Sequence, residues 1–142
     1  MRRLFVVMYL ALPATLGGCP SEPPPECVAP EHAIDESCAP GYVPTFTNVY
    51  KNTIQMGCGS TKSSCHSATG HSGGLSFADQ DTAYEQLLAA GQKRVIPGDP
   101  ACSEVIVRIN SPGEDYQMPP GDALTAPARC ALVQWVIQGA LP

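Results

Sequence analysis

Residues 57–66 read GCGSTKSSCH, and in this stretch Cys65 stands immediately before His66. Covalent attachment of haem needs this order, because the thiol bonds a vinyl group at the haem edge while the adjacent imidazole reaches the iron. Further along the chain, residues 116–121 read YQMPPG, so that Met118 precedes two prolines that restrict its backbone. A thioether is a soft, neutral iron ligand. The two stretches together predict an iron site with His66 and Met118 as its axial ligands.

Four segments with apolar residues at helical spacing lie around these motifs, and no run alternates for long enough to demand a strand. Thr45 is a plausible side-chain cap for the first segment, and Gly98-Asp99-Pro100 is a plausible start for the third, which ends by Pro112. The other segments are predicted at residues 45–56, 79–91 and 124–139. The sequence therefore predicts an all-α fold.

The order of these features resembles that of small single-haem class I c-type cytochromes, especially the planctomycete-type cytochrome c domains of envelope lipoproteins. The resemblance covers roughly residues 46–142 and includes the stretch VIPGDP at residues 95–100. It implies a small cytochrome c-like domain whose N- and C-terminal helices cross, with Phe46 or Tyr50 packed against Trp135. It also implies that the chain transfers single electrons.

For the site, the resemblance implies His66 as the proximal ligand, Met118 as the distal ligand and Cys65 as a thioether to haem c. The spacing of the cysteines departs from the family, which places them three positions apart, where this chain has Lys62. The upstream cysteine is Cys58, with six residues between it and Cys65.

Three outcomes stay open from this spacing: attachment through both thiols, a single thioether through Cys65, or a Cys58–Cys65 disulfide without haem. The last would make the chain a haem-free, disulfide-stapled lipoprotein that keeps a cytochrome c-like scaffold as a binding or structural module. A zinc or copper site formed by Cys58, Cys65, His66 and His71 is a further alternative.

The N-terminus predicts export and a lipid anchor. Residues 1–18 contain two arginines, an apolar run and small residues, which is typical of a signal peptide. The stretch Leu16-Gly17-Gly18-Cys19 resembles the bacterial lipobox, which implies a lipid on Cys19. We therefore expect the protein on the periplasmic side of the cell envelope, and Pro20 after the anchor favours the outer membrane.

Lipidation of Cys19 leaves six of the seven cysteines, and an oxidising compartment favours disulfides among them. Residues 19–44 are rich in proline and poor in aliphatic residues, so we expect a tether before a domain at residues 45–142. The predicted disulfides join Cys27 to Cys38 within the tether and Cys102 to Cys130 within the domain.

The net charge of the chain limits the classes of partner that it is expected to bind. Loss of Arg2 and Arg3 with the signal peptide leaves six basic against thirteen acidic residues, a formal charge of −7. This acidity argues against nucleic-acid binding. No Ser-His-Asp arrangement or pair of carboxylates stands out, so we expect an electron carrier and not an enzyme. The expected partners are redox proteins of the envelope, and the membrane through the lipid on Cys19.

Overall fold

The computed structural model describes residue 19 and residues 22–59 and 65–142, so the predicted signal peptide at residues 1–18 lies outside the described residues. Within the described part the chain forms helices and loops and no strand, which confirms the all-α prediction. None of the helices in this part has the length and apolar character needed to cross a membrane. The elements are η1 (Pro30–His32), α1 (Phe46–Val49), η2 (Tyr50–Ile54), α2 (Gln55–Gly57), η3 (Ser72–Gly74), α3 (Gln80–Leu87), α4 (Glu104–Ile109) and α5 (Ala126–Ile137).

The first helical stretch combines α1, a π-helical η2 and α2 into one continuous run that ends at Cys58. The hydroxyl of Thr45 accepts a hydrogen bond from the amide of Asn48 at 3.3 Å, so the predicted cap is confirmed. Apolar residues on one face, among them Phe46 and Ile54, are buried in the core. This helix therefore carries the chain from the core directly to Cys58.

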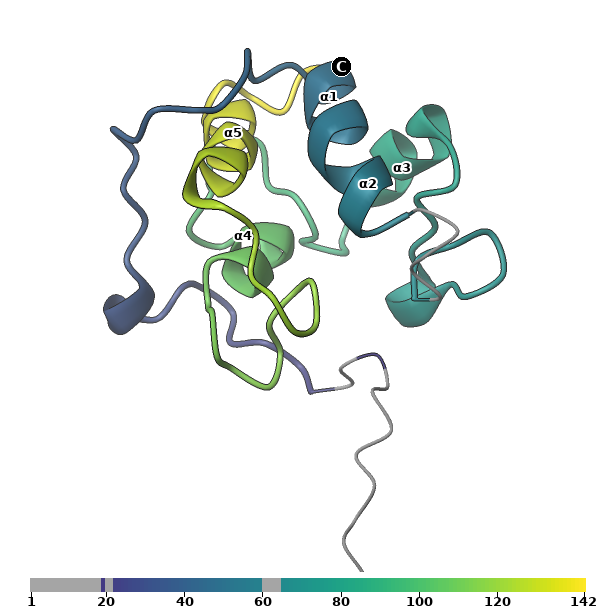
Figure 1. The fold of residues 1–142 in the computed structure, drawn as a ribbon, viewed down its shortest axis with the longest axis horizontal. Coiled ribbons are helices and arrows are strands. Elements are labelled where there is room, and N and C mark those ends of the chain that lie inside the picture. The colour runs from purple at the N-terminus through teal and green to yellow at the C-terminus, as the bar shows by residue number, and fades with distance from the viewer. Residues whose placement is uncertain (1–18, 20–21, 60–64) are drawn as a thin grey trace, which may run out of the picture.

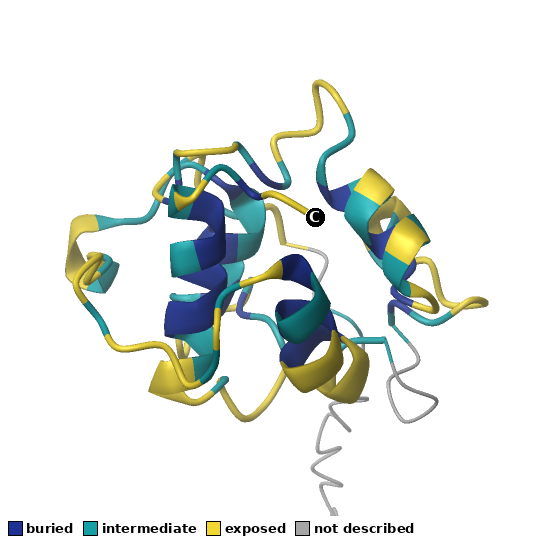
Figure 2. Ribbon diagram, turned by 90° about the horizontal axis from the view of Figure 1, so that it is seen from above, coloured by how far each residue is buried: buried dark blue, intermediate teal, exposed yellow. Residues whose placement is uncertain are grey.

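The first and last helices pack against each other, as the sequence predicts (Figure 1). The rings of Phe46 and Trp135 lie 5.1 Å apart between centroids, and the indole of Trp135 donates a hydrogen bond to the carbonyl of Leu141 at 2.7 Å. Tilted aromatic pairs at this distance add about 0.5–1.5 kcal/mol beyond the burial of their surface. Figure 2 shows that the helices turn their buried residues toward one another and their exposed residues outward.

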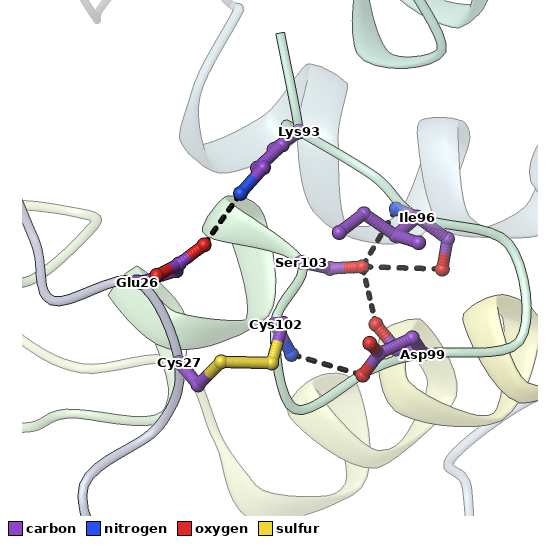
Figure 3. Close-up of a disulfide and its surroundings, with 7 residues drawn as sticks. All are labelled: Glu26, Cys27, Lys93, Ile96, Asp99, Cys102 and Ser103. Carbon is purple, nitrogen blue, oxygen red and sulfur yellow. Dashed lines mark hydrogen bonds and ion pairs between the residues drawn. A yellow bond between two sulfur atoms is a disulfide. The ribbon is translucent and has the colours of Figure 1, made fainter. Parts of the chain in front are cut away.

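The third helix begins later than predicted, at Glu104, because the segment before it forms a hydrogen-bonded turn (Figure 3). Gly98 has a φ of 82°, which ends any helical path there. The hydroxyl of the fully buried Ser103 donates to the carbonyl of Asp99 at 2.7 Å and accepts from the amide of Ile96 at 2.8 Å. These bonds satisfy the backbone groups of the turn and hold Cys102 at the start of α4.

Residues 22–44, here called the strap, are not a free tether. Figure 1 shows this segment running along the outside of α4 and α5. The amide of Val28 donates a hydrogen bond to the carbonyl of Ala101 at 2.8 Å. The amide of Gly41 donates one to the carbonyl of Pro127 at 3.1 Å. Ile34 and Tyr42 pack against the hydrophobic core. The strap is therefore bonded to and packed against the domain that the sequence predicts at residues 45–142.

Two disulfides fasten the strap to the helical domain. Cys27 pairs with Cys102 and Cys38 pairs with Cys130. The four cysteines are disulfide-bonded as predicted, but the predicted pairing of Cys27 with Cys38 and of Cys102 with Cys130 is wrong. Proximity in the sequence favours a local loop, whereas the strap extends along the domain and brings Cys27 to the turn before α4 and Cys38 to α5.

Candidate functional site

A pocket of about 190 Å³ lies between the end of the first helical stretch, the segment after Cys65, the α4 helix and the Met118 loop. The four residues that the sequence predicts to hold haem all line it, although they come from two distant parts of the chain, residues 58–66 and the loop that contains Met118. These residues are Cys58, Cys65, His66 and Met118. The walls are largely apolar and include Leu75, Phe77, Leu87, Val105 and Ile109.

His66 is buried, with 9% of its surface exposed, and its ring packs against Phe77 at 5.0 Å between centroids. Its main-chain carbonyl accepts from the amide of Phe77 at 2.8 Å, which fixes the residue in place. Burial lowers the pKa of His66, and the nearby backbone of Leu75 and Ser72 offsets part of that shift. The imidazole is thus held in its neutral form, the form that binds metals.

The Nδ1 atom of His66 is buried and has no hydrogen-bond partner among the described residues. Buried polar atoms are nearly always paired, because an unpaired one costs about 1–3 kcal/mol. An unpaired ring nitrogen on a residue that lines a pocket therefore indicates a place where a further group binds.

Met118 lies in a loop that its neighbour Gln117 organises. The buried side-chain amide of Gln117 donates to the carbonyls of Pro119 and Gly121, both at 2.8 Å, and its oxygen accepts from the amide of Gly113 at 2.7 Å. The amide of Met118 itself donates to the carbonyl of Arg108 at 3.0 Å, which ties the loop to α4. Sequence reasoning assigned no role to Gln117, and its position inside the motif YQMPPG, directly before Met118, was the available signal.

Two arginines also line the pocket and were not predicted. Arg94 donates to the carbonyls of Gly73 at 2.7 Å and Gln86 at 3.2 Å. Arg108 pairs with Glu104 at 2.8 Å and donates to the carbonyl of Tyr116 at 3.2 Å. The chain has few basic residues, and two of them lie at this pocket. Guanidinium groups bind carboxylates well, so the two arginines favour a ligand that carries carboxylates. The scarcity of basic residues was the signal that could have directed attention to them.

The cysteines of the site differ from expectation. Cys65 forms a disulfide with Cys19, with 5.9 Å between their Cα atoms, and Cys58 is unpaired. A sulfur atom in a disulfide carries neither a lipid nor a haem thioether, so this bond and the two expected modifications, a lipid on Cys19 and a thioether on Cys65, exclude one another. The alternative Cys58–Cys65 disulfide is absent. Burial raises the pKa of the Cys58 thiol to about 11, so this thiol stays protonated.

The alternative zinc or copper site is not formed. The part of the chain that the structure describes contains no group of three or more histidine, cysteine or acidic residues placed to hold a metal ion. His71 is exposed, and its ring contacts the carbonyl of Ala68. This finding does not bear on an iron site formed by His66 and Met118, because such a site has only two protein ligands and one of them is a methionine.

Comparison with known proteins supports the same reading of the pocket. The family model described as Planctomycete cytochrome C matches residues 63–122, which include Cys65, His66 and Met118. No curated protein and no solved structure matches the chain. The family match covers both predicted axial ligands and the segment between them. Residues 63–122 are therefore similar to a planctomycete-type cytochrome c-like domain, and the resemblance expected from the sequence is confirmed.

Proposed function

We propose that this chain is a single-haem c-type cytochrome that carries one electron at a time in the bacterial envelope. The observation that carries the proposal is that His66 and Met118, which lie far apart in the sequence, line one pocket. The family match over residues 63–122 supports a cytochrome-like role for the same segment.

The residues of the pocket fit haem. The Nδ1 atom of His66 is unpaired among the described residues, and the neutral imidazole next to Cys65 suits an axial ligand. Met118 supplies a soft second ligand from a loop that Gln117 holds in place. When bound, haem supplies one-electron chemistry between ferric and ferrous iron. A histidine and methionine pair of ligands raises the reduction potential.

The remaining pocket residues have separate tasks. The apolar side chains of the pocket, among them Leu75 and Ile109, would exclude water from a bound haem, which lowers the local dielectric constant. Arg94, and Arg108 in its pair with Glu104, would supply positive charge toward the two carboxylates of haem. The unpaired Cys58 supplies a thiol at the edge of the pocket.

The proposed place of action is the periplasmic side of the envelope, with a lipid on Cys19 as the anchor and the outer membrane favoured. The two disulfides that leave Cys19 free, Cys27–Cys102 and Cys38–Cys130, support an oxidising compartment. The proposed partners are redox proteins of the envelope that donate and accept single electrons.

The experiment is a pyridine haemochrome spectrum of the chain purified from a bacterium with haem-attachment machinery. A c-type spectrum with a covalent haem mass adduct is the expected result. A colourless protein without the adduct contradicts the proposal.

Met118→Ala is a sharper test of the ligand. It removes the soft axial ligand, so we expect the spectrum to change and the reduction potential to fall. Met56→Ala is the matched control, because Met56 is 72% exposed and does not line the pocket. Equal spectra for the two variants would exclude Met118 as the ligand.

One observation favours a second function. Cys65 is already bonded to Cys19, which is what a haem-free, disulfide-stapled binding or structural module requires. In such a module Met118→Ala changes packing alone, and the protein stays colourless under every condition of the spectrum above.

A further inference from the structure

The disulfide between Cys19 and Cys65 joins two residues that the sequence assigns to different modifications. Cys65 lines the pocket and precedes the buried His66, whereas Cys19 is the residue expected to carry the lipid anchor. Each sulfur atom can hold only one of three bonds: the disulfide, a lipid thioether or a haem thioether. The state of one cysteine therefore decides what is open to the other.

We propose that modification of Cys19 controls whether Cys65 can bond the haem. In this proposal, which rests on the proposed function, lipidation of Cys19 removes the disulfide partner of Cys65 and leaves its thiol free in the pocket. An unmodified Cys19 captures Cys65 instead. Anchoring and cofactor attachment then depend on the same sulfur pair, and a chain without its anchor does not receive haem at Cys65.

The other cysteines support this assignment. Cys27, Cys38, Cys102 and Cys130 are consumed by the two strap disulfides, and none of them lines the pocket. Cys58 lines the pocket and is unpaired, but its raised pKa keeps the thiol protonated. A protonated thiol is a poor nucleophile, so Cys58 exchanges slowly with the Cys19–Cys65 disulfide. Lipidation thus changes the number of thiols at the pocket from one, Cys58, to two, Cys58 and Cys65.

Each step is balanced. In lipidation, the Cys19 sulfur bonds the diacylglycerol carbon of a phospholipid, and the head group leaves as a phosphate ester with the proton. In attachment, the S–H of Cys65 adds across a vinyl group, so that one S–C and one C–H bond form without net oxidation. In the competing reaction, the two thiols give two electrons and two protons to a disulfide oxidant of the envelope, which becomes a dithiol.

The test compares three forms of the chain in cells with haem-attachment machinery. The first has its own leader, the second has a secretory leader that is not lipidated, and the third adds Cys19→Ser to the second. Intact mass and peptide mapping without reduction report the lipid, the haem and the bond at Cys65. We expect haem on Cys65 in the first form, its loss with a Cys19–Cys65 disulfide in the second, and its recovery in the third.

A control and a haem-independent measurement complete the design. The pair Cys38→Ser and Cys130→Ser, placed in the second form, removes a strap disulfide and should leave Cys65 blocked. In haem-deprived cells, with Cys58→Ser added to all forms, alkylation should label Cys65 in the third form and not in the second.

Two results overturn the proposal: equal amounts of haem on Cys65 in the second and third forms, or equal alkylation of Cys65 in both. Failure of the proposed function gives a different pattern. No form then carries haem, while the difference in alkylation at Cys65 persists and supports the control of Cys65 by Cys19.

Discussion

The two strap disulfides and the pocket disulfide have the same chemistry in different surroundings. Cys27–Cys102 and Cys38–Cys130 lie beside backbone hydrogen bonds that hold the strap to the helical domain, and neither lines the pocket. Cys19–Cys65 lies next to His66 and uses the sulfur that would bond haem in the proposed cytochrome. Position, and not bond type, thus separates the two strap disulfides from the one that would compete with the proposed function.

The largest change in the free energy of unfolding is expected when a disulfide of the strap is removed. Replacing both Cys38 and Cys130 by serine opens a loop of 92 residues, so the free energy of unfolding should fall by about 2–5 kcal/mol, chiefly because the unfolded chain gains entropy. Urea denaturation measures the change. A decrease below about 0.5 kcal/mol would mean that the strap is held by its hydrogen bonds and packing alone.

A smaller and local effect is expected at the Met118 loop. Gln117→Ala removes three hydrogen bonds from a buried side chain, so the free energy of unfolding should fall by about 1–3 kcal/mol. Hydrogen exchange should rise in residues 111–121 and stay unchanged in the strap.

Gln134→Ala is the matched control for that loop, because the exposed amide of Gln134 donates to the carbonyl of Glu36 in the strap at 2.6 Å. The Gln134→Ala variant should raise hydrogen exchange in the strap alone. If both glutamine variants raise exchange in the same peptides, the strap and the Met118 loop open together and the contrast between them fails.

The smallest change in stability is expected at the ion pair between Lys93 and Glu26, which precedes Cys27 in the strap. The hydrogen bond from Lys93 lowers the pKa of the Glu26 carboxyl (Figure 3). The pair therefore stabilises the folded chain at pH values above the ordinary pKa of a glutamate. This stabilisation is lost as the pH falls and the carboxylate is protonated. Both side chains are largely exposed, and water screens their attraction. Thermal unfolding of Glu26→Gln at neutral pH should match that of the unaltered chain, and a clear loss would show that this pair fastens the strap.

Local patterns predicted much of the fold. The spacing of apolar residues located the main helical segments of the described chain, and Thr45 was assigned its capping role correctly. The packing of Phe46 against Trp135 was implied by the family resemblance. The third helix was placed too early, because the buried hydroxyl of Ser103 stabilises a turn that a propensity argument cannot detect. Gln117, Arg94 and Arg108 were missed because their roles depend on segments that meet only in the folded chain.

Residue type and spacing within short segments were enough to predict the helices and the all-α class, and they led to the proposal of His66 and Met118 as ligands. The pairing of the cysteines and the packing of the proline-rich strap follow from the folded chain alone. Disulfide partners are chosen by distance in space, and the folded chain brings Cys27 to Cys102, Cys38 to Cys130 and Cys19 to Cys65 across long separations in sequence. For the same reason, the link between Cys19 and the pocket could not be predicted from either motif alone.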